Sequence, residues 1–117
     1  APKIFNVNWF RKNDEGQFLW PGFGENLRVL EWILDRCEGK VDARETAIGY
    51  VPYAKDINLD GIEDEVSEDT LESILTVDNS LWAAEVPGIK EFYAKFGDAL
   101  PEGIKKELDN LEKKLAE

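Results

Sequence analysis

Apolar and polar side chains alternate along most of the first ten residues, a pattern typical of a β-strand. The segment Ile4–Phe10 is also rich in aromatic and β-branched residues, so we predict a strand there. A polar cluster follows and ends in Gly16, whose backbone can adopt the positive φ that a tight turn requires. We therefore expect a β-hairpin with a short returning strand at Phe18–Trp20, ended by Pro21 because proline has no N–H to donate.

The pattern then changes to a helical period. Apolar residues recur at every third or fourth position, which predicts an amphipathic helix from Glu25 or Asn26 to about Cys37. Gly39 lies where a C-terminal cap of this helix is expected. The positions expected to form the apolar face are Leu27, Leu30, Ile33 or Leu34, and Cys37.

Beyond residue 40 the pattern first predicts one more strand and a short helix. Thr46–Val51 has the composition of a strand and is ended by Pro52. The next segment, Tyr53–Glu65, contains too many turn-forming residues for an assignment. Ser67 is a good N-cap residue, so we predict a helix over Glu68–Thr76.

Two further helices complete the predicted architecture. One begins at Asp78 or Asn79 and ends near Phe96, with a kink or a break expected at Pro87. The last occupies Pro101–Leu115, because proline is tolerated in a first turn and leucines recur at helical spacing after it. Strands come first and helices follow, which indicates the α+β class.

The composition limits the chemistry that the chain can perform. Its 117 residues suit one domain, and they include no histidine, which excludes a Ser-His-Asp or Cys-His site and most catalytic zinc sites. The single cysteine, Cys37, cannot form an internal disulfide, fits a reducing compartment and is most simply a core residue. No apolar run approaches the ~20 residues that span a bilayer. We expect a soluble, cytoplasmic protein.

Charged and aromatic residues are distributed unequally along the chain. The net charge is −11, and all of it lies after residue 40, since residues 1–40 carry six basic and six acidic groups. Seven of the thirteen aromatic residues lie within the first 32 residues. A ligand bound by aromatic rings would therefore bind in the neutral N-terminal part. The negative charge of the remainder argues against nucleic acid and anionic membranes as partners. The acidic run Asp60–Asp69 lacks the spacing of an EF-hand, and we interpret it as a solvated loop.

Three phenylalanines surround the predicted turn and the start of the first helix. If the hairpin forms, Phe10 and Phe18 lie on adjacent strands, and Phe23 follows in a glycine-flanked loop. Such rings could stack on a flat heterocycle, but stacking alone does not distinguish one base from another. The carboxamide of Asn26 could make that distinction, and Gly24 would let the backbone approach a ligand closely.

The same residues have a purely structural interpretation. Phenylalanines of a hairpin are more often part of a core than of a pocket, and Asn26 before Leu27 is by default a helix N-cap. We expect Trp9, Trp20 and Trp32 to be buried. The loop has neither the dinucleotide fingerprint nor a phosphate-binding lysine. In this alternative the chain is an acidic helical protein-interaction module whose aromatic cluster is only hydrophobic core.

Longer strings of residues make the ligand hypothesis more specific. They are Asn6–Lys12, the string Phe-Leu-Trp-Pro-Gly-Phe-Gly-Glu-Asn at Phe18–Asn26, Arg28–Leu30 followed by Trp32, and Ile48–Pro52. In these strings the chain closely resembles the GTP-dependent phosphoenolpyruvate carboxykinases, and the resemblance extends over essentially the whole chain. It matches only the C-terminal part of a family whose members are roughly five times longer.

The resemblance implies a parent enzyme that interconverts oxaloacetate and GTP with phosphoenolpyruvate, GDP and carbon dioxide in gluconeogenesis. In that family three phenylalanines enclose the guanine, an asparagine hydrogen-bonds the base, and the segment leading to this asparagine contacts the nucleotide. The resemblance therefore assigns guanine-nucleotide binding to Phe10, Phe18, Phe23, Gly24, Glu25 and Asn26.

The resemblance also implies what this region lacks. The family's phosphate-binding loop, reactive cysteine, mobile lid and metal ligands precede it, so these residues do not bind the Mn²⁺ or Mg²⁺ ion of the parent, and the chain alone is expected to be inactive. We expect residues 1–40 to form the guanine pocket and residues 41–117 to form an acidic helical end of the nucleotide-binding domain. The parent is expected to be a monomer. The separated piece is expected to self-associate through an exposed apolar patch or to be locally disordered within Tyr53–Glu65.

Overall fold

The computed structural model describes residues 1–117, and their packing divides the chain into two units. The first unit comprises residues 1–45 and 50–76, and the second comprises residues 46–49 and 77–117. The change in charge after residue 40 thus lies inside the first unit. None of the helices has both the length and the hydropathy that crossing a membrane requires.

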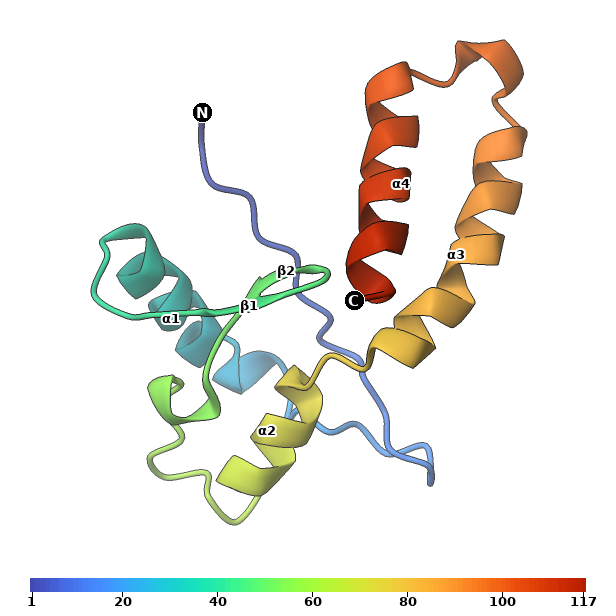
Figure 1. The fold of residues 1–117 in the computed structure, drawn as a ribbon. Coiled ribbons are helices and arrows are strands. Elements are labelled where there is room, and N and C mark those ends of the chain that lie inside the picture. Colours follow the sequence, from blue (N-terminus) through green and yellow to red (C-terminus); the bar gives the residue numbers. More distant parts are fainter. The chain divides into compact units, whose positions relative to one another are not determined.

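Helices account for most of the regular structure, together with one small hairpin (Figure 1). The α-helices are α1 (Leu27–Cys37), α2 (Glu68–Leu75), α3 (Asn79–Ala94) and α4 (Glu102–Leu115). The paired strands are β1 (Arg44–Thr46) and β2 (Gly49–Val51). Short 3₁₀ helices are η1 (Phe23–Glu25), η2 (Ala54–Asp56) and η3 (Gly97–Ala99). This combination confirms the predicted α+β class.

The N-terminal segment does not form the predicted strand. Residues Ile4–Phe10 have no regular strand structure, and the side chain of Ile4 is exposed. A strand is stable when its N–H and C=O groups pair with a neighbouring strand, and the pairing at this hairpin is a single antiparallel bridge between Lys12 and Phe18. The returning strand predicted at Phe18–Trp20 is reduced to that bridge.

The tight turn after this segment is formed as predicted. Gly16 has a φ of 80°, in the left-handed region that favours glycine. The side-chain oxygen of Asn13 accepts hydrogen bonds from the backbone N–H groups of Glu15 and Gln17, at 2.9 and 3.0 Å. Because these bonds are local, the turn forms without the support of a longer sheet.

Helix α1 confirms the predicted helix and its glycine cap. Gly39 has a φ of 74°, and the N–H of Lys40 donates to the carbonyl of Asp35 at 2.9 Å. The N–H of Gly39 donates to the carbonyl of Arg36 at 3.2 Å. The two bonds satisfy carbonyl groups that the helix end would otherwise leave unpaired.

The buried face of α1 differs from the predicted one. The helix turns Trp32 into the core, and Val29 and Ile33 pack partly buried beside it. Cys37 is exposed, so its assignment to the core is wrong. Both sides of the helix carry apolar residues, and their spacing could not decide which side faces inward. The exposed apolar stripe consists of Leu27, Leu30, Leu34 and Cys37.

A hairpin replaces the single strand predicted at Thr46–Val51. Strands β1 and β2 pair with each other, and Gly49 at the start of β2 has a φ of 123°. The hydroxyl of Thr46 donates to the carbonyl of Gly49 at 2.6 Å. Strand β2 ends before Pro52, as predicted.

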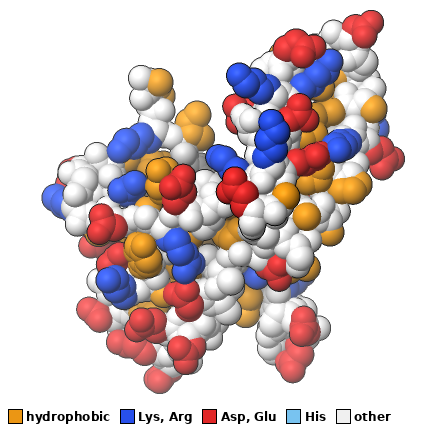
Figure 2. All heavy atoms as spheres, in the orientation of Figure 1, with side chains coloured by type: hydrophobic (Ala, Val, Ile, Leu, Met, Phe, Trp, Pro, Cys, Tyr) orange, Lys and Arg blue, Asp and Glu red, His pale blue; other side chains and the backbone are white.

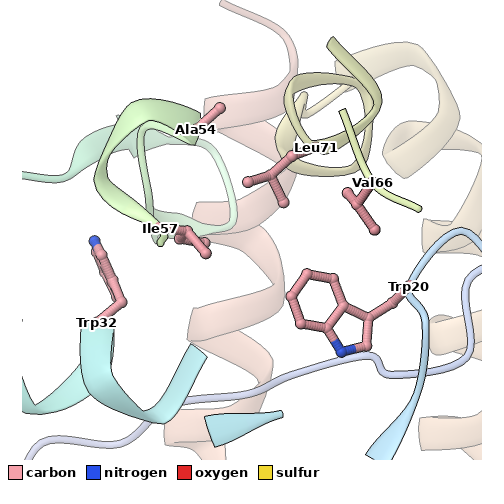
Figure 3. Packing of buried hydrophobic residues seen from close by; sticks show 6 residues of the cluster. All are labelled: Trp20, Trp32, Ala54, Ile57, Val66 and Leu71. Carbon is pink, nitrogen blue, oxygen red and sulfur yellow. The ribbon is translucent and has the colours of Figure 1, made fainter. Parts of the chain in front are cut away.

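The core of the first unit draws on the segment that the pattern left unassigned. Residues of Tyr53–Glu65 supply buried side chains to it, so this segment is built into the core rather than locally disordered. Trp9 packs partly buried against the same cluster. Figure 3 shows the buried members of this core, namely Trp20, Trp32, Ala54, Ile57, Val66 and Leu71.

Helix α2 is held at both of its ends. The hydroxyl of Ser67 accepts a hydrogen bond from the N–H of Thr70 at 3.1 Å, which confirms the predicted N-cap. At the other end Arg11 donates to the carbonyl of Ile74 at 2.6 Å, and Arg44 donates to the next carbonyl at 3.1 Å. Guanidinium groups suit a helix C-terminus because its carbonyls are unpaired and partially negative. Arg11 thereby ties the N-terminal turn to α2.

The second unit is built mainly from the helices α3 and α4. Helix α3 is not broken at Pro87 and bends along its length (Figure 1), as expected where a proline removes one backbone N–H. Lys90 of α3 forms an ion pair with Glu112 of α4. The side chains buried between α3 and α4 are Val86, Leu108 and Leu115. Other hydrophobic side chains lie at the surface of the chain (Figure 2).

The predicted ends of these two helices need small corrections. Helix α3 ends at Ala94, two residues before the predicted Phe96. Pro101 is the N-cap residue of α4 rather than part of its first turn, with an extended backbone conformation (ψ 141°). Asp78 is the N-cap of α3, and its carboxylate accepts hydrogen bonds from the N–H groups of Ser80 and Leu81.

The cap of α3 predicts a pH dependence. The hydroxyl of Ser80 and the backbone N–H groups of Leu81 and Ser80 hold the pKa of Asp78 below its ordinary value of 3.8. Because the folded pKa is lowered, the stabilisation is complete above pH 3.8 and is lost as the pH falls through the folded pKa. An NMR titration of the side-chain carboxyl of Asp78 should give the lowered pKa. In Asp78→Asn, whose amide also caps but does not titrate, α3 should lose this component of its acid sensitivity; an equal sensitivity in both proteins would contradict the prediction.

Candidate functional site

Two of the three predicted rings meet at the N-terminal turn. The ring centroids of Phe10 and Phe18 are 6.1 Å apart, with their planes inclined by 59°, and both side chains are exposed. The bridge between Lys12 and Phe18 brings the Lys12 ammonium to 5.1 Å from the centroid of the Phe18 ring. The pair is therefore an open aromatic surface with a cation beside it.

The third ring stands apart from this pair. Phe23 lies in η1 with its side chain 92 % exposed, and it forms no ring pair with Phe10 or Phe18. Fully burying a phenylalanine side chain contributes about 1.5–3 kcal/mol to stability, and this chain forgoes that contribution at all three positions. Exposure of the three rings contradicts the interpretation of them as hydrophobic core.

The glycines on either side of Phe23 differ in their role. Gly22 has a φ of 126°, a conformation in which any other residue would be strained. Gly24 has no such φ, and a Cβ added to it would meet no atom within 4 Å. The space next to Gly24 is therefore open, which is compatible with the predicted close approach of a ligand to its backbone.

Asn26 lies at the N-cap position of α1, but its side chain does not cap the helix. Its backbone is already helical (φ −62°, ψ −28°), and no cap hydrogen bond is formed by the side chain. Instead, its Oδ1 accepts a hydrogen bond from Nε1 of Trp20 at 2.9 Å. Its Nδ2 has no partner in the chain and is not buried. The capping interpretation is therefore wrong, and two N–H donors of Asn26 remain open to a ligand.

The carboxylate of Glu25 is engaged within the chain. Its Oε2 lies 2.6 Å from Nε of Arg28, and both side chains are half-buried. The remaining guanidinium nitrogens of Arg28 donate to the carbonyls of Asn58 and Asp60, at 2.9 and 2.8 Å. Glu25 is thus charge-paired and fixed to the loop after η2, and because its N–H donates to the carbonyl of Gly22 at 3.0 Å, its backbone carbonyl is the group left for a ligand.

Sequence reasoning missed three residues that organise this region. Arg28 follows Glu25 at a spacing of three, which is a known signal for an ion pair on a helix. Lys12 faces Phe18 across the turn, and the register of the predicted hairpin implied that pairing. The contact of Trp20 with the asparagine has no such signal, because it joins two residues across an irregular loop. No group of three or more histidine, cysteine, aspartate or glutamate side chains is arranged to hold a metal ion.

Comparison with known proteins connects this geometry to a family. Residues 1–114 match the family described as phosphoenolpyruvate carboxykinase C-terminal P-loop domain. The chain belongs to the GTP-dependent phosphoenolpyruvate carboxykinase family. The matched span contains every residue predicted for the site.

Curated members of the family are similar to the chain along nearly its whole length. The chain is 50 % identical over 114 residues to the phosphoenolpyruvate carboxykinase (GTP) of Paenarthrobacter aurescens. It is 52 % identical over 115 residues to that of Neocallimastix frontalis, and 49 % identical over 115 residues to that of Chlamydia trachomatis. Each match covers 97 % of this chain but only 18 or 19 % of the relative. The chain thus spans less than a fifth of the length of these relatives.

Proposed function

We propose that this chain is the guanine-binding part of a longer phosphoenolpyruvate carboxykinase. That enzyme, a monomer of the cytoplasm, converts oxaloacetate and GTP to phosphoenolpyruvate, GDP and carbon dioxide in gluconeogenesis. The observation that carries the proposal is the 50 % identity, over 97 % of the chain, to an enzyme named for its use of GTP. The alternative of an acidic interaction module is not favoured, because the family match covers the chain and the three rings are exposed.

In this proposal the exposed phenylalanine rings stack on the guanine base. Stacking on an aromatic side chain contributes about 1–3 kcal/mol per base, and rings that are not packed in a core remain available for it. Phe10 and Phe18 supply one aromatic surface, and Phe23 supplies a separate ring on η1. Asn26 offers a pair of free N–H donors to the base edge, and the backbone at Gly24 is accessible.

The local charges suit an anionic nucleotide. The carboxylate of Glu25 would repel phosphate groups if it were free, but its pairing with Arg28 compensates that charge. The ammonium of Lys12 lies against the Phe18 ring and adds a positive charge at the aromatic surface. These features support nucleotide binding in an otherwise acidic chain.

Other parts of the enzyme supply the reaction chemistry in this proposal. The residues of this chain do not fit the divalent metal, Mn²⁺ or Mg²⁺, because there is no histidine and no cluster of acidic side chains suited to it. The chain also lacks the lysine-containing phosphate loop. Decarboxylation and phosphoryl transfer therefore fall to residues outside this chain, and the chain by itself is inactive.

The remainder of the parent chain is also the proposed partner of the apolar stripe of α1. Leu27 and Leu34 on that stripe are 72 % and 65 % exposed, although helices that are apolar on both sides are normally buried. More than four-fifths of the length of the relatives lies outside the matched region, which is ample to cover the stripe. Self-association of the chain on its own stays a prediction.

A comparison of two nucleotides tests the proposed function. The whole enzyme that carries this chain is titrated with GDP and with ADP, following tryptophan fluorescence, because Trp20 contacts Asn26 directly. We expect tighter binding of GDP and loss of that preference in Asn26→Ala. The control is Asn110→Ala in α4, which makes the same asparagine-to-alanine change at another position. It should retain the preference for GDP over ADP, since the side chain of Asn110 makes no hydrogen bond. Equal binding of GDP and ADP by the unaltered enzyme would refute the proposal.

A further inference from the structure

The hydrogen bond between Trp20 and Asn26 determines which atoms of the carboxamide face a ligand. Trp20 is 7 % exposed and belongs to the core of the first unit. In Figure 3 the nitrogen of its indole lies on the edge of the ring that is turned away from Val66 and Leu71. That nitrogen donates to Oδ1 of Asn26 at 2.9 Å. The donor of this hydrogen bond therefore belongs to a buried side chain, whereas its acceptor belongs to a side chain that is only half-buried.

This contact removes an ambiguity that every amide side chain has. A carboxamide carries an acceptor on one side and two donors on the other, and a half-turn about its last bond exchanges them. The indole N–H is only a donor, so it requires the oxygen of Asn26 as its partner. The half-turn would bring two donors together and leave the buried indole N–H unpaired, which is unfavourable. Trp20 thus fixes the carboxamide with Nδ2 free.

We infer that Trp20 is a positioning residue that sets the base specificity of this site. With Oδ1 occupied, Asn26 presents only N–H donors, and these complement the carbonyl that guanine carries at position 6. Adenine carries an amino group at that position, and two donors cannot satisfy each other. A site built around one hydrogen-bonding edge rejects the base that lacks it. This inference rests on the proposed function, since it concerns how the same site distinguishes two purines.

The decisive variant removes the indole N–H and keeps an aromatic ring. In Trp20→Phe the carboxamide of Asn26 is free to turn and to offer Oδ1 to the adenine amino group. In the whole enzyme we expect the ratio of GDP to ADP affinity to fall about tenfold, mainly because ADP binds more tightly. A residue that only stabilised the fold would change the binding of both nucleotides alike and leave the ratio unchanged.

The chain offers a matched control for this variant. Trp32 is buried in the same core, at 4 % exposure, but its Nε1 has no hydrogen-bond partner. Trp32→Phe therefore makes the same change in the same core without removing a hydrogen bond. We expect it to keep the ratio of GDP to ADP affinity. An equal fall of the ratio in both variants, or no fall in Trp20→Phe, would overturn the inference.

A second substitution keeps the inference testable if Trp20→Phe does not fold. Asn26→Asp retains an oxygen for the indole N–H of Trp20 but has no donor for the base. We expect it to fold, to keep the downfield NMR signal of the hydrogen-bonded indole proton, and to lose its preference for GDP. A full preference for GDP in Asn26→Asp would overturn the inference. Failure of the proposed function is distinct, because the unaltered enzyme would then show no preference between the nucleotides.

Discussion

Replacing Phe23 by alanine should weaken GDP binding by the whole enzyme about 5- to 150-fold, because stacking contributes about 1–3 kcal/mol per base. The side chain is 92 % exposed and packs in no ring pair, so its removal takes nothing from the core. The melting temperature should therefore stay unchanged while the dissociation constant rises. Calorimetric titration with GDP and a thermal melt of the same samples measure the two quantities.

Two further substitutions give the controls for this prediction. Phe23→Tyr keeps an aromatic face and should bind GDP nearly as well as the unaltered enzyme. Phe5→Ala removes a ring that stands edge-on to Trp32 at 6.3 Å, so it should lower stability without a selective effect on GDP. Unchanged affinity in Phe23→Ala would show that this ring does not contact the base, and would leave Phe10 and Phe18 as the only aromatic contacts.

Replacing Leu71 by alanine should cost the first unit about 2–5 kcal/mol of unfolding free energy, the range found for buried leucines. Leu71 is 2 % exposed and belongs to the same buried cluster as Trp20 and Val66 (Figure 3). The loss combines the transfer free energy of the removed methyl groups with the cavity that rigid neighbours leave behind. Urea unfolding of the chain, followed by the fluorescence of its buried tryptophans, measures the change.

The matched control is the same substitution at an exposed site. Leu27→Ala removes the same atoms from a side chain that is 72 % exposed, so its effect on the chain should stay within about 0.5 kcal/mol. Because both substitutions remove the same atoms, a difference in unfolding free energy between them measures the effect of burial alone. If Leu71→Ala and Leu27→Ala lowered the unfolding free energy equally, Leu71 would not be buried in the core of the first unit.

The features that the sequence predicted well depend on neighbouring residues. Helix α2 begins after Ser67 because its hydroxyl accepts an N–H only three residues away, and α1 ends just before Gly39 because glycine tolerates the positive φ that the cap requires. The turn at Gly16 is formed by Asn13 in the same way. Such interactions are local, so their signals are complete within a few residues of sequence.

The features that the sequence predicted wrongly depend on contacts with residues far along the chain. Ile4–Phe10 alternates as a strand does, but the chain supplies no strand to pair with it. Helix α1 is apolar on two sides; the burial of Trp32 is as predicted, but only packing against the core decides that the face with Leu27, Leu34 and Cys37 is exposed. The pattern of Thr46–Val51 predicts one strand, whereas the folded chain reverses direction within this segment.

The sequence by itself determined the four helices, the caps at Ser67 and Gly39, the family and the residues proposed to bind guanine. Only the tertiary structure decided how those residues are presented: which rings are exposed, and which side of the Asn26 carboxamide is free. The physical reason is that a motif specifies residue types, whereas orientation depends on contacts with other parts of the fold. Here the deciding contact comes from a buried indole whose position is set by the core around it.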